Sequence, residues 1–236
     1  MTKITLFILN IFDKIYQKKV IKSFKKIFKN KINELADIGS HKGETINLFH
    51  KNFIIKNIYA YEASPQNFLY LKKNIKKMKL NKTRIKIYNF ALGQKNEIKK
   101  FKQMSESSSS TLSNLDLNSK YFKMKNFFLN FRFNSKPFTE IYIQIKKSSH
   151  IKKKIDLLKI DTEGYEFNIL KGLGKNIKDI RVIFFEHHYD KMILKNYTFG
   201  DINKYLTNNK FKRYAKFKMP FRKSFEYIYI NERFFI

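Results

Sequence analysis

The feature that most constrains the fold is an apolar run that ends in a glycine turn, Glu34-Leu-Ala-Asp-Ile-Gly-Ser-His-Lys-Gly43. Gly39 can adopt a positive φ in a tight turn, and Gly43 leaves room for a ligand to approach the backbone. The pattern predicts a strand over 34–38 and a helix over 43–51. The next predicted strand, 58–62, ends in Glu62, the place where an acid hydrogen-bonds a ribose in nucleoside-binding α/β folds. We therefore expect a nucleoside cofactor at the carboxyl edge of a parallel sheet.

The glycine spacing narrows the choice of cofactor. A dinucleotide fingerprint, G-x-G-x-x-G, requires a glycine where this chain has His41. The pattern Asp-x-Gly-x-x-x-Gly, which begins at Asp37, instead resembles the first motif of methyltransferases that use S-adenosylmethionine (SAM). SAM has no phosphate, so it requires a carboxylate and open backbone in place of an anion cradle. The alternative for Asp37 is an ordinary acid at a strand end or turn.

Composition bounds the size and the chemistry of the molecule. A chain of 236 residues, 43% of them hydrophobic and 17% aromatic, suffices for one α/β domain with a full core, or for a domain plus an appendage. The sequence contains no cysteine, which excludes a disulfide framework, a thiol nucleophile and a zinc–thiolate site. This composition is compatible with the reducing cytoplasm, where we expect the protein.

The chain is strongly basic, with a formal net charge of +31. Clustered lysines bind nucleic acid by releasing counterions from its phosphates, so RNA binding is one interpretation. Only six of the 50 basic residues are arginines, which bind phosphates and base edges in bidentate fashion, and the other 44 are lysines spread along the sequence. We therefore favour a solvated basic surface with generic attraction to anions and no specific nucleic-acid partner.

Residues 1–33 are predicted to form an extension of one or two basic amphipathic helices before a domain over 34–236. Apolar residues recur at helical spacing over 4–15 and over 21–28, and lysines fill much of the remaining face. The apolar run 4–12 is too short to span a bilayer. No small-residue cleavage site follows it, so we expect no signal peptide. We favour a helix that covers one edge of the sheet; the alternative is peripheral contact with an anionic membrane, at the inner membrane surface.

The rest of the chain alternates strands and helices, which is typical of a doubly wound α/β fold. Ser64 suits the cap of the helix after the second strand, and Pro65 suits its first turn. Two closing strands fit an antiparallel hairpin at one edge of a mostly parallel sheet. The predicted strands are 84–90, 97–101, 140–145, 157–160, 181–185, 211–217 and 225–231, and the predicted helices are 65–78, 165–170 and 199–208.

Residues 103–136 interrupt this alternation. Serines at 105 and 107–110 form a polar run, and an aromatic, lysine-rich segment follows over 121–138. The serines are too polar for a core, so the segment is either a flexible linker or a lid over the site. Aromatic side chains among lysines also suit stacking on bases, which leaves an RNA-binding alternative open.

A second informative stretch is Ile155-Asp-Leu-Leu-Lys-Ile-Asp-Thr-Glu-Gly-Tyr-Glu166. Asp161 ends a buried strand and Glu163 follows two residues later, so in extended backbone both carboxylates point to the same side. Gly164 then releases the chain into a helix. We expect the two carboxylates to lie at the sheet edge and to be more than turn residues. The next strand ends in Glu186-His187-His188.

With both stretches in hand, the chain resembles the FkbM family of SAM-dependent methyltransferases. The resemblance implies a class I methyltransferase fold with a doubly wound, seven-stranded sheet. It also implies SAM as the cofactor and O-methylation of a hydroxyl on a sugar, a glycan or a similar small metabolite. The matching pieces lie in the family's order over 34–188: Asp37-Ile-Gly-Ser-His-Lys-Gly43, Tyr61-Glu-Ala-Ser-Pro65, Asn89-Phe-Ala-Leu-Gly93, Asp156-Leu-Leu-Lys-Ile-Asp-Thr-Glu-Gly-Tyr-Glu166 and Phe184-Phe-Glu-His187.

The resemblance further implies which residues bind the cofactor. Asp37 and the turn after it would hold the methionine part, Glu62 the ribose hydroxyls, and the segment around Asn89 and Ala91 would flank the adenine. This chain departs from the family at Ser40-His41, where Ala-Asn is frequent, and at Ala63, where Pro is frequent. The implied cofactor-binding residues are Asp37, Gly39, Ser40, Gly43, Glu62, Ala63, Asn89 and Ala91.

For catalysis, Asp161, Glu163 and His187 are the candidates to hold the acceptor and remove its proton. Histidine suits the base because its unperturbed pKa lies near neutrality. The alternative for His187 is a hydrogen-bonded structural residue. These three side chains and Glu186 would suit Mg²⁺ if they converged, but the spacing does not require a metal and we predict none.

Two other functions stay open. An RNA-binding or RNA-modifying methyltransferase would use the basic surface. The Pro-Pro-aromatic motif of enzymes that methylate base nitrogens is, however, replaced here by Asp161-Thr-Glu-Gly164, which contains two acids. A non-catalytic protein of the membrane surface would use the helices at 3–33. The sequence leaves the acceptor and the oligomeric state open.

Overall fold

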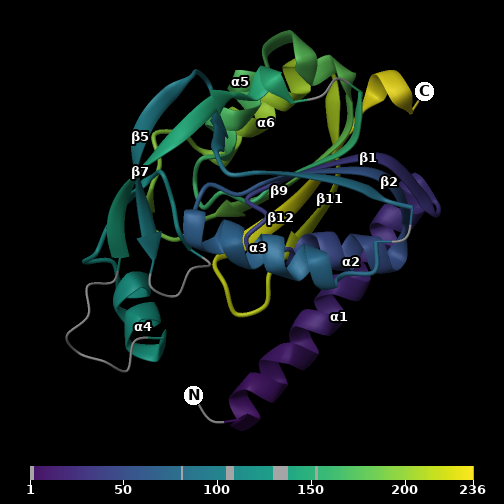
Figure 1. Ribbon diagram of the computed structural model, residues 1–236. Helices are drawn as coiled ribbons and strands as arrows, with labels where there is room; N and C mark the ends of the chain where they lie inside the picture. Colours follow the sequence, from purple (N-terminus) through teal and green to yellow (C-terminus); the bar gives the residue numbers. More distant parts are fainter. Residues whose placement is uncertain (1–2, 81, 105–108, 130–137, 152–153, 236) are drawn as a thin grey trace.

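A central sheet runs through the molecule and helices cover both of its faces (Figure 1). The structure, a computed structural model, describes residues 3–80, 82–104, 109–129, 138–151 and 154–235. The strands of the central sheet are β1 (Lys31–Ile38), β2 (Ile54–Tyr61), β3 (Arg84–Tyr88), β8 (Ile155–Ile160), β9 (Ile180–His188), β11 (Phe211–Lys218) and β12 (Ser224–Asn231). The helices are α1 (Lys3–Phe28), α2 (Glu44–Asn52), α3 (Pro65–Lys77), α4 (Lys120–Leu129), α5 (Glu166–Leu173) and α6 (Phe199–Asn208), with short 3₁₀ helices η1 (Ser148–His150), η2 (Gly174–Asp179) and η3 (Glu232–Phe234).

Among the described residues the central sheet has seven strands, in the order β11-β12-β9-β8-β1-β2-β3. The strands from β9 to β3 are parallel, and β12 and β11 run antiparallel at the other edge. This confirms the predicted doubly wound, mostly parallel sheet with a reversed hairpin. Every residue of β8 is buried, which explains its nearly continuous apolar sequence, because a central parallel strand is covered on both faces.

Helices α1, α2 and α3 pack on one face of the sheet, and α5 and α6 pack on the other (Figure 1). The predicted cap of α3 is confirmed: Ser64 accepts a hydrogen bond from the backbone N–H of Asn67, and Pro65 occupies the first turn. Each face therefore has its own apolar core, and the strand ends stay free for the loops that follow them.

The N-terminal prediction needs two corrections. Residues 31–33 are strand rather than helix, because Lys29 turns the chain with a positive φ of 55° and Ile32 then pairs beside Ile55. The boundary drawn between residues 33 and 34 consequently falls inside β1. Helix α1 also lies on a face of the sheet rather than along an edge, since the ring of Phe24 packs against Phe184 of β9 and a ring of α2.

A second, three-stranded sheet was not predicted as a separate unit. It consists of β4 (Ala91–Gly93), β7 (Phe138–Lys147) and β5 (Glu97–Met104), in that order, and a pair of two-residue strands, β6 (Asn114–Leu115) and β10 (Ile193–Leu194), lies apart from it. The strands expected at 97–101 and 140–145 belong to this sheet. Of the interrupting segment 103–136, residues 105–108 and 130–136 lie outside the described part of the chain.

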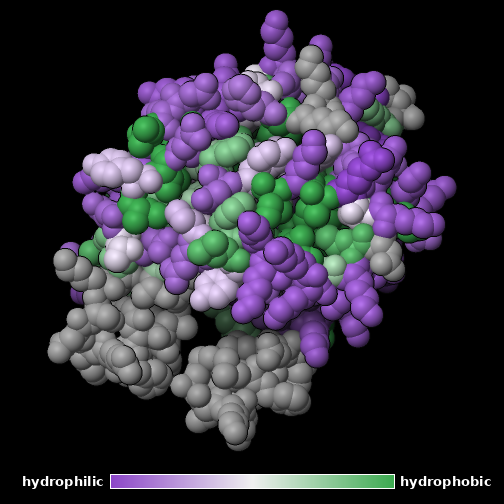
Figure 2. Space-filling view, in the orientation of Figure 1, coloured by the Kyte–Doolittle hydropathy of each residue, from purple (hydrophilic) through white to green (hydrophobic). Residues whose placement is uncertain are grey.

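Hydrophilic side chains are distributed over the visible face of the molecule and are not confined to one stripe (Figure 2). This distribution agrees with lysines that are spread through the sequence.

Candidate active site

The carboxyl ends of β1, β2 and β8 surround a cavity. Its empty space is about 560 Å³, a volume that includes open solvent at its mouth. Turns after the three strands supply the polar part of its wall, and the second sheet supplies an apolar part. The described residues that line it include Ile38, Gly39, His41, Tyr61, Glu62, Ala63, Phe90, Ala91, Leu92, Phe101, Ser110, Leu112, Asp161, Thr162, Glu163 and Tyr165.

The turn after β1 needs a glycine because the end of β8 lies against it. Gly39 has a φ of +79°, and a Cβ at this position would lie 1.8 Å from the carbonyl oxygen of Asp161. Its backbone N–H donates to the carbonyl of Tyr61, and the N–H of Asp161 donates to the carbonyl of Ile38, both at 2.9 Å. Gly39 thus lets the ends of three neighbouring strands close together at one side of the cavity.

Glu62 places a buried carboxylate in the cavity wall. Its two oxygens accept backbone hydrogen bonds from His41, at 2.7 Å, and from Ser64, at 2.9 Å. The side chain is fixed by these bonds, and each oxygen keeps a second lone pair for a ligand. Burial raises the pKa of Glu62 to about 7, in spite of the two backbone donors.

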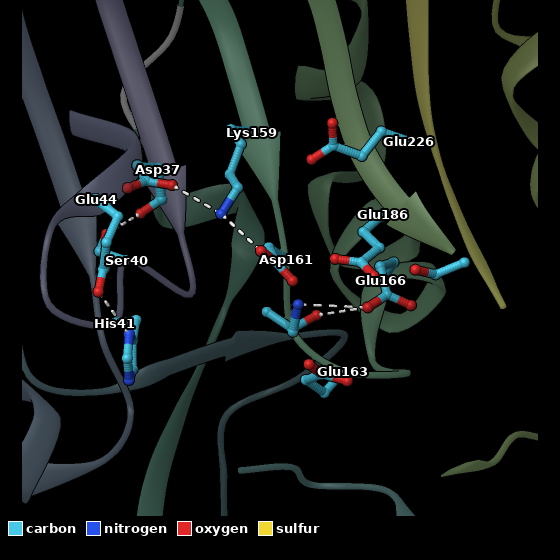
Figure 3. Close-up of polar contacts among 12 residues, drawn as sticks. Asp37, Ser40, His41, Glu44, Lys159, Asp161, Glu163, Glu166, Glu186 and Glu226 are labelled. Atoms are coloured by element: carbon cyan, nitrogen blue, oxygen red, sulfur yellow. Dashed lines mark hydrogen bonds and ion pairs between the residues drawn. The ribbon is translucent and has the colours of Figure 1, made fainter. Parts of the chain in front are cut away.

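Lys159 links two of the predicted site acids (Figure 3). Its Nζ lies 3.1 Å from an oxygen of Asp161 and 3.5 Å from an oxygen of Asp37. Burial alone would lower the pKa of Lys159, but Asp161 and Asp37 raise it, so the side chain is a buried cation. Burial raises the pKa of Asp37, whereas Lys159 outweighs burial and lowers that of Asp161. Lys159 was not among the predicted site residues, although a single lysine in the otherwise apolar run 157–160 was a visible signal.

The loop after β8 holds Glu163 in an uncommon conformation. Its φ is +51° and that of Gly164 is +93°, and a positive φ in a residue with a side chain marks local strain of the kind found at functional sites. Other segments hold the loop: Thr111 donates to the carbonyl of Glu163 at 2.6 Å, and Ser113 to that of Gly164 at 2.9 Å. The described end of the serine-rich segment therefore lies against this loop, and Ser110 and Leu112 line the cavity beside it.

His188 connects Glu163 to a buried acidic cluster. Its Nε2 lies 3.0 Å from Glu163 and 3.2 Å from Glu186, and its Nδ1 lies 3.4 Å from Asp190. Burial alone would lower the pKa of His188, but these carboxylates, Glu163 above all, raise it well above its usual value. Burial, reinforced by Asp161, raises the pKa of Glu186 to about 8. The imidazolium of His188 thus positions the carboxylate of Glu163 at the cavity.

His187 points away from this cluster, because neighbouring residues of a strand face opposite sides. Its ring packs 4.9 Å from that of Tyr189 and 5.8 Å from that of Phe199. Burial, with Lys195 and His188 nearby, lowers the pKa of His187 to about 3, so the ring is neutral. Within the described structure His187 lies outside the cavity lining.

Four further predicted residues lie behind the lining formed by the described residues. Asp37 is fully buried at the ion pair with the lysine of β8. Ser40 donates its hydroxyl to the carbonyl of Asp37 at 2.8 Å. Gly43 has a φ of +92° and leaves its space to α3, since an added Cβ would lie 3.1 Å from Leu71. Asn89 donates to the carbonyl of Glu62 at 2.9 Å.

The acids do not converge on a metal site. In the part of the chain that the structure describes, no group of three or more His, Cys, Asp or Glu side chains has an arrangement that could hold a metal ion. Asp37 and Asp161 both lie near the ammonium group of Lys159. Glu163 pairs instead with the imidazole of His188.

Comparison with solved structures shows the same fold in methyltransferases. The methyltransferase FkbM from Methylobacillus flagellatus KT has a TM-score of 0.55 and 13% identity, covering 84% of this chain and 44% of that one. The magnesium protoporphyrin IX methyltransferase ChlM from Synechocystis PCC 6803 with bound SAH has a TM-score of 0.55 and 8% identity, covering 98% and 89% of the two chains. The present chain thus spans less than half of the FkbM protein's length.

No curated protein gives a significant match to the sequence. A model of the methyltransferase FkbM domain matches residues 37–213, which is more than half of the chain. The match contains both strand-end motifs and the carboxyl ends of the three strands that surround the cavity. The chain therefore belongs to the FkbM methyltransferase family, whose fold it shares, and SAM is its cofactor.

Proposed function

We propose that this protein is an O-methyltransferase that acts on a hydroxyl of a sugar, a glycan or a similar small metabolite. The observation that supports this function best is the pair of carboxylates, Asp161 and Glu163, in the wall of the same cavity as Glu62. One side of the cavity then suits an adenosyl group, and the other offers acceptors for the hydrogen bonds of a hydroxyl.

The residues present fit the cofactor. Glu62 keeps free lone pairs for the two ribose hydroxyls. Ala63, Phe90 and Leu92 form an apolar wall against which the adenine would lie, and the turn at Gly39 would adjoin the methionine part. When bound, SAM supplies a methyl group that its positively charged sulfonium has already activated.

The protein must then align the acceptor oxygen and remove its proton. We assign the proton to Glu163, whose carboxylate is held at the cavity by His188. We assign Asp161 to orient the hydroxyl, because Lys159 keeps this side chain ionised and fixed. His187 receives no chemical role, since its ring packs among aromatic side chains.

The test follows transfer of a tritiated methyl group from SAM to a panel of sugars, nucleotide sugars and glycans, with total RNA as a separate arm. A methyl ether formed on a hydroxyl survives alkali, whereas a methyl ester does not. We expect Glu163→Gln to lower the rate by about 10²–10⁴-fold, the usual contribution of a general base. The control is Glu140→Gln, the same change at an exposed position of β7.

Label found only in RNA would favour the RNA-modifying alternative, which the net charge of +31 supports. Alkali-labile label, or full turnover by Glu163→Gln, would contradict the proposed chemistry. The Glu140→Gln variant distinguishes loss of the base from a general effect of removing a negative charge.

A further inference from the structure

Helix α1 continues past the sheet that anchors it. Its second half is in the core, where Val20, Phe24 and Phe28 are buried. Its first half extends beyond α2 and α3 toward the chain's amino terminus (Figure 1). Residues 3–15 correspond to about 20 Å of helix. The amino-terminal part of this helix is an uncharged run in the sequence, residues 4–12, and a lysine-rich part follows it.

The turn between β11 and β12 lies beside this projecting half. The ring of Phe221 in the turn contacts the ring of Phe12 edge to face, with centroids 5.2 Å apart. Tyr16 fixes the arrangement by donating its hydroxyl to Glu226 of β12 at 2.5 Å. Phe12 and Phe221 nevertheless remain 45% and 66% exposed, as does Ile15 at 47%. Two segments far apart in the sequence therefore present apolar side chains at one place.

Lysines occupy another face of the same helix. Lys14, Lys18, Lys22 and Lys25 recur three and four residues apart, which places them on one face of α1, and they line a groove between α1 and α2. Lys218 at the end of β11 and Lys223 in the turn are both exposed. Helix α1 thus combines exposed apolar side chains with a row of lysines, which is the composition of helices that lie at the surface of anionic membranes.

We infer that the projecting half of α1 and the β11–β12 turn form a docking surface for an anionic lipid bilayer. The apolar side chains would enter the headgroup region, and the lysines would contact acidic headgroups, each adding to the attraction. RNA would satisfy the lysines but would leave the exposed Phe12, Ile15 and Phe221 in water, so the bilayer is the better match. No helix in the described part of the chain is long and apolar enough to cross a membrane, which makes this contact peripheral.

The docking surface lies on the side of the sheet where the cavity is. The β11–β12 turn lies beside the carboxyl end of β9, since Ser224 pairs with His188 and the backbone N–H of Tyr189 donates to the carbonyl of Lys223. His188 in turn contacts Glu163 of the cavity wall. A bilayer at this surface therefore lies near the carboxylate end of the cavity. Resting on the proposed function, this placement suits a hydroxyl carried by a lipid-linked acceptor.

The test measures co-sedimentation of the full chain with vesicles of phosphatidylcholine alone and with about one third phosphatidylglycerol. We expect binding to the anionic vesicles only. Lys14→Glu/Lys18→Glu and, separately, Phe12→Ser/Phe221→Ser should weaken it by about tenfold or more. The control, Lys175→Glu/Lys178→Glu, makes the same charge change at exposed lysines of η2, after α5 on the opposite face of the sheet.

Calorimetry with S-adenosylhomocysteine (SAH) and the unfolding midpoint verify that each variant is folded. A wild-type protein that binds SAH but not anionic vesicles would overturn the docking surface and leave the proposed function intact. An equal loss of vesicle binding in the η2 control would show that the binding depends on net charge alone and would overturn the docking surface. Three outcomes would contradict the bilayer as the partner. The double phenylalanine variant could still bind the vesicles, or the substitutions could dissociate a dimer without changing vesicle binding. The same residues could also prove to bind an RNA oligonucleotide selectively.

Discussion

Replacing Lys159 by methionine removes the cation between Asp37 and Asp161. Lys159 is 4% exposed, and methionine would fill much of its space without the charge. Removing one partner of a buried ion pair costs about 3–5 kcal/mol, compared with a total free energy of unfolding of about 5–15 kcal/mol for a typical domain. Asp37 is fully buried, whereas the side chain of Asp161 is 33% exposed. Most of the cost should therefore come from Asp37, and we expect the lower end of this range.

The loss should depend on pH with a defined sign. Without the lysine, burial should raise the folded-state pKa of Asp37 further and that of Asp161 as well. A carboxyl with a raised folded-state pKa stabilises the fold below its unfolded pKa and loses this contribution as the pH rises through the folded value. The deficit of Lys159→Met relative to the wild type should therefore be larger at about pH 8 than at about pH 5.

Urea denaturation at both pH values, followed by circular dichroism, measures this deficit. The control is Lys100→Met, which breaks an exposed ion pair of similar length, 3.3 Å to Glu140, and should leave the unfolding midpoint unchanged. The double variant Lys159→Met/Asp37→Asn should recover part of the loss. A deficit that is equal at the two pH values would refute the electrostatic reasoning and point to packing instead.

Three further predictions concern the wild-type acids, the glycine turn and the attachment of α1. Burial raises the pKa of Glu62 to about 7 and that of Glu186 to about 8, so both residues stabilise the fold at low pH. The free energy of unfolding should therefore fall by a few kcal/mol between about pH 5 and pH 9. A rise over this range, measured by urea denaturation, would contradict this. Gly39→Ala should abolish SAH binding, because its Cβ would collide with a backbone carbonyl oxygen at 1.8 Å, and unchanged affinity in calorimetry would be inconsistent with the turn. Tyr16→Phe should lower the free energy of unfolding by about 1 kcal/mol, the contribution of its hydrogen bond to Glu226, and an unchanged urea midpoint would argue against this attachment of α1.

Local patterns sufficed to predict much of the fold. The cap at Ser64 and the helix after it depend on residues a few positions apart, and the apolar run before Asp161 could only be a buried strand. The second sheet was not recognised as a unit because its pairing is not local. Ala91 pairs with Ile145, and much of β5 is exposed and rich in lysine, so no alternation marked a common face.

The site was predictable as a place but not in its internal contacts. Glu62, Asp161 and Glu163 reach the cavity because they follow strands whose carboxyl ends must meet at one edge. Which of the two adjacent histidines reaches the acids depends on the pleat of β9, and a shift of one residue exchanges His187 for His188. The sequence contains both histidines but does not determine that register.

The central claim is that Glu62 anchors the cofactor in the described cavity, and calorimetric titration with SAH tests it most directly. We expect the wild type and Glu140→Gln to bind SAH with similar affinity, and Glu62→Gln to bind it about tenfold or more weakly, because a hydrogen bond to a charged group is lost. Circular dichroism would verify that the variant is folded. Absence of SAH binding by the wild type, or equal affinity in a folded Glu62→Gln variant, would contradict the claim.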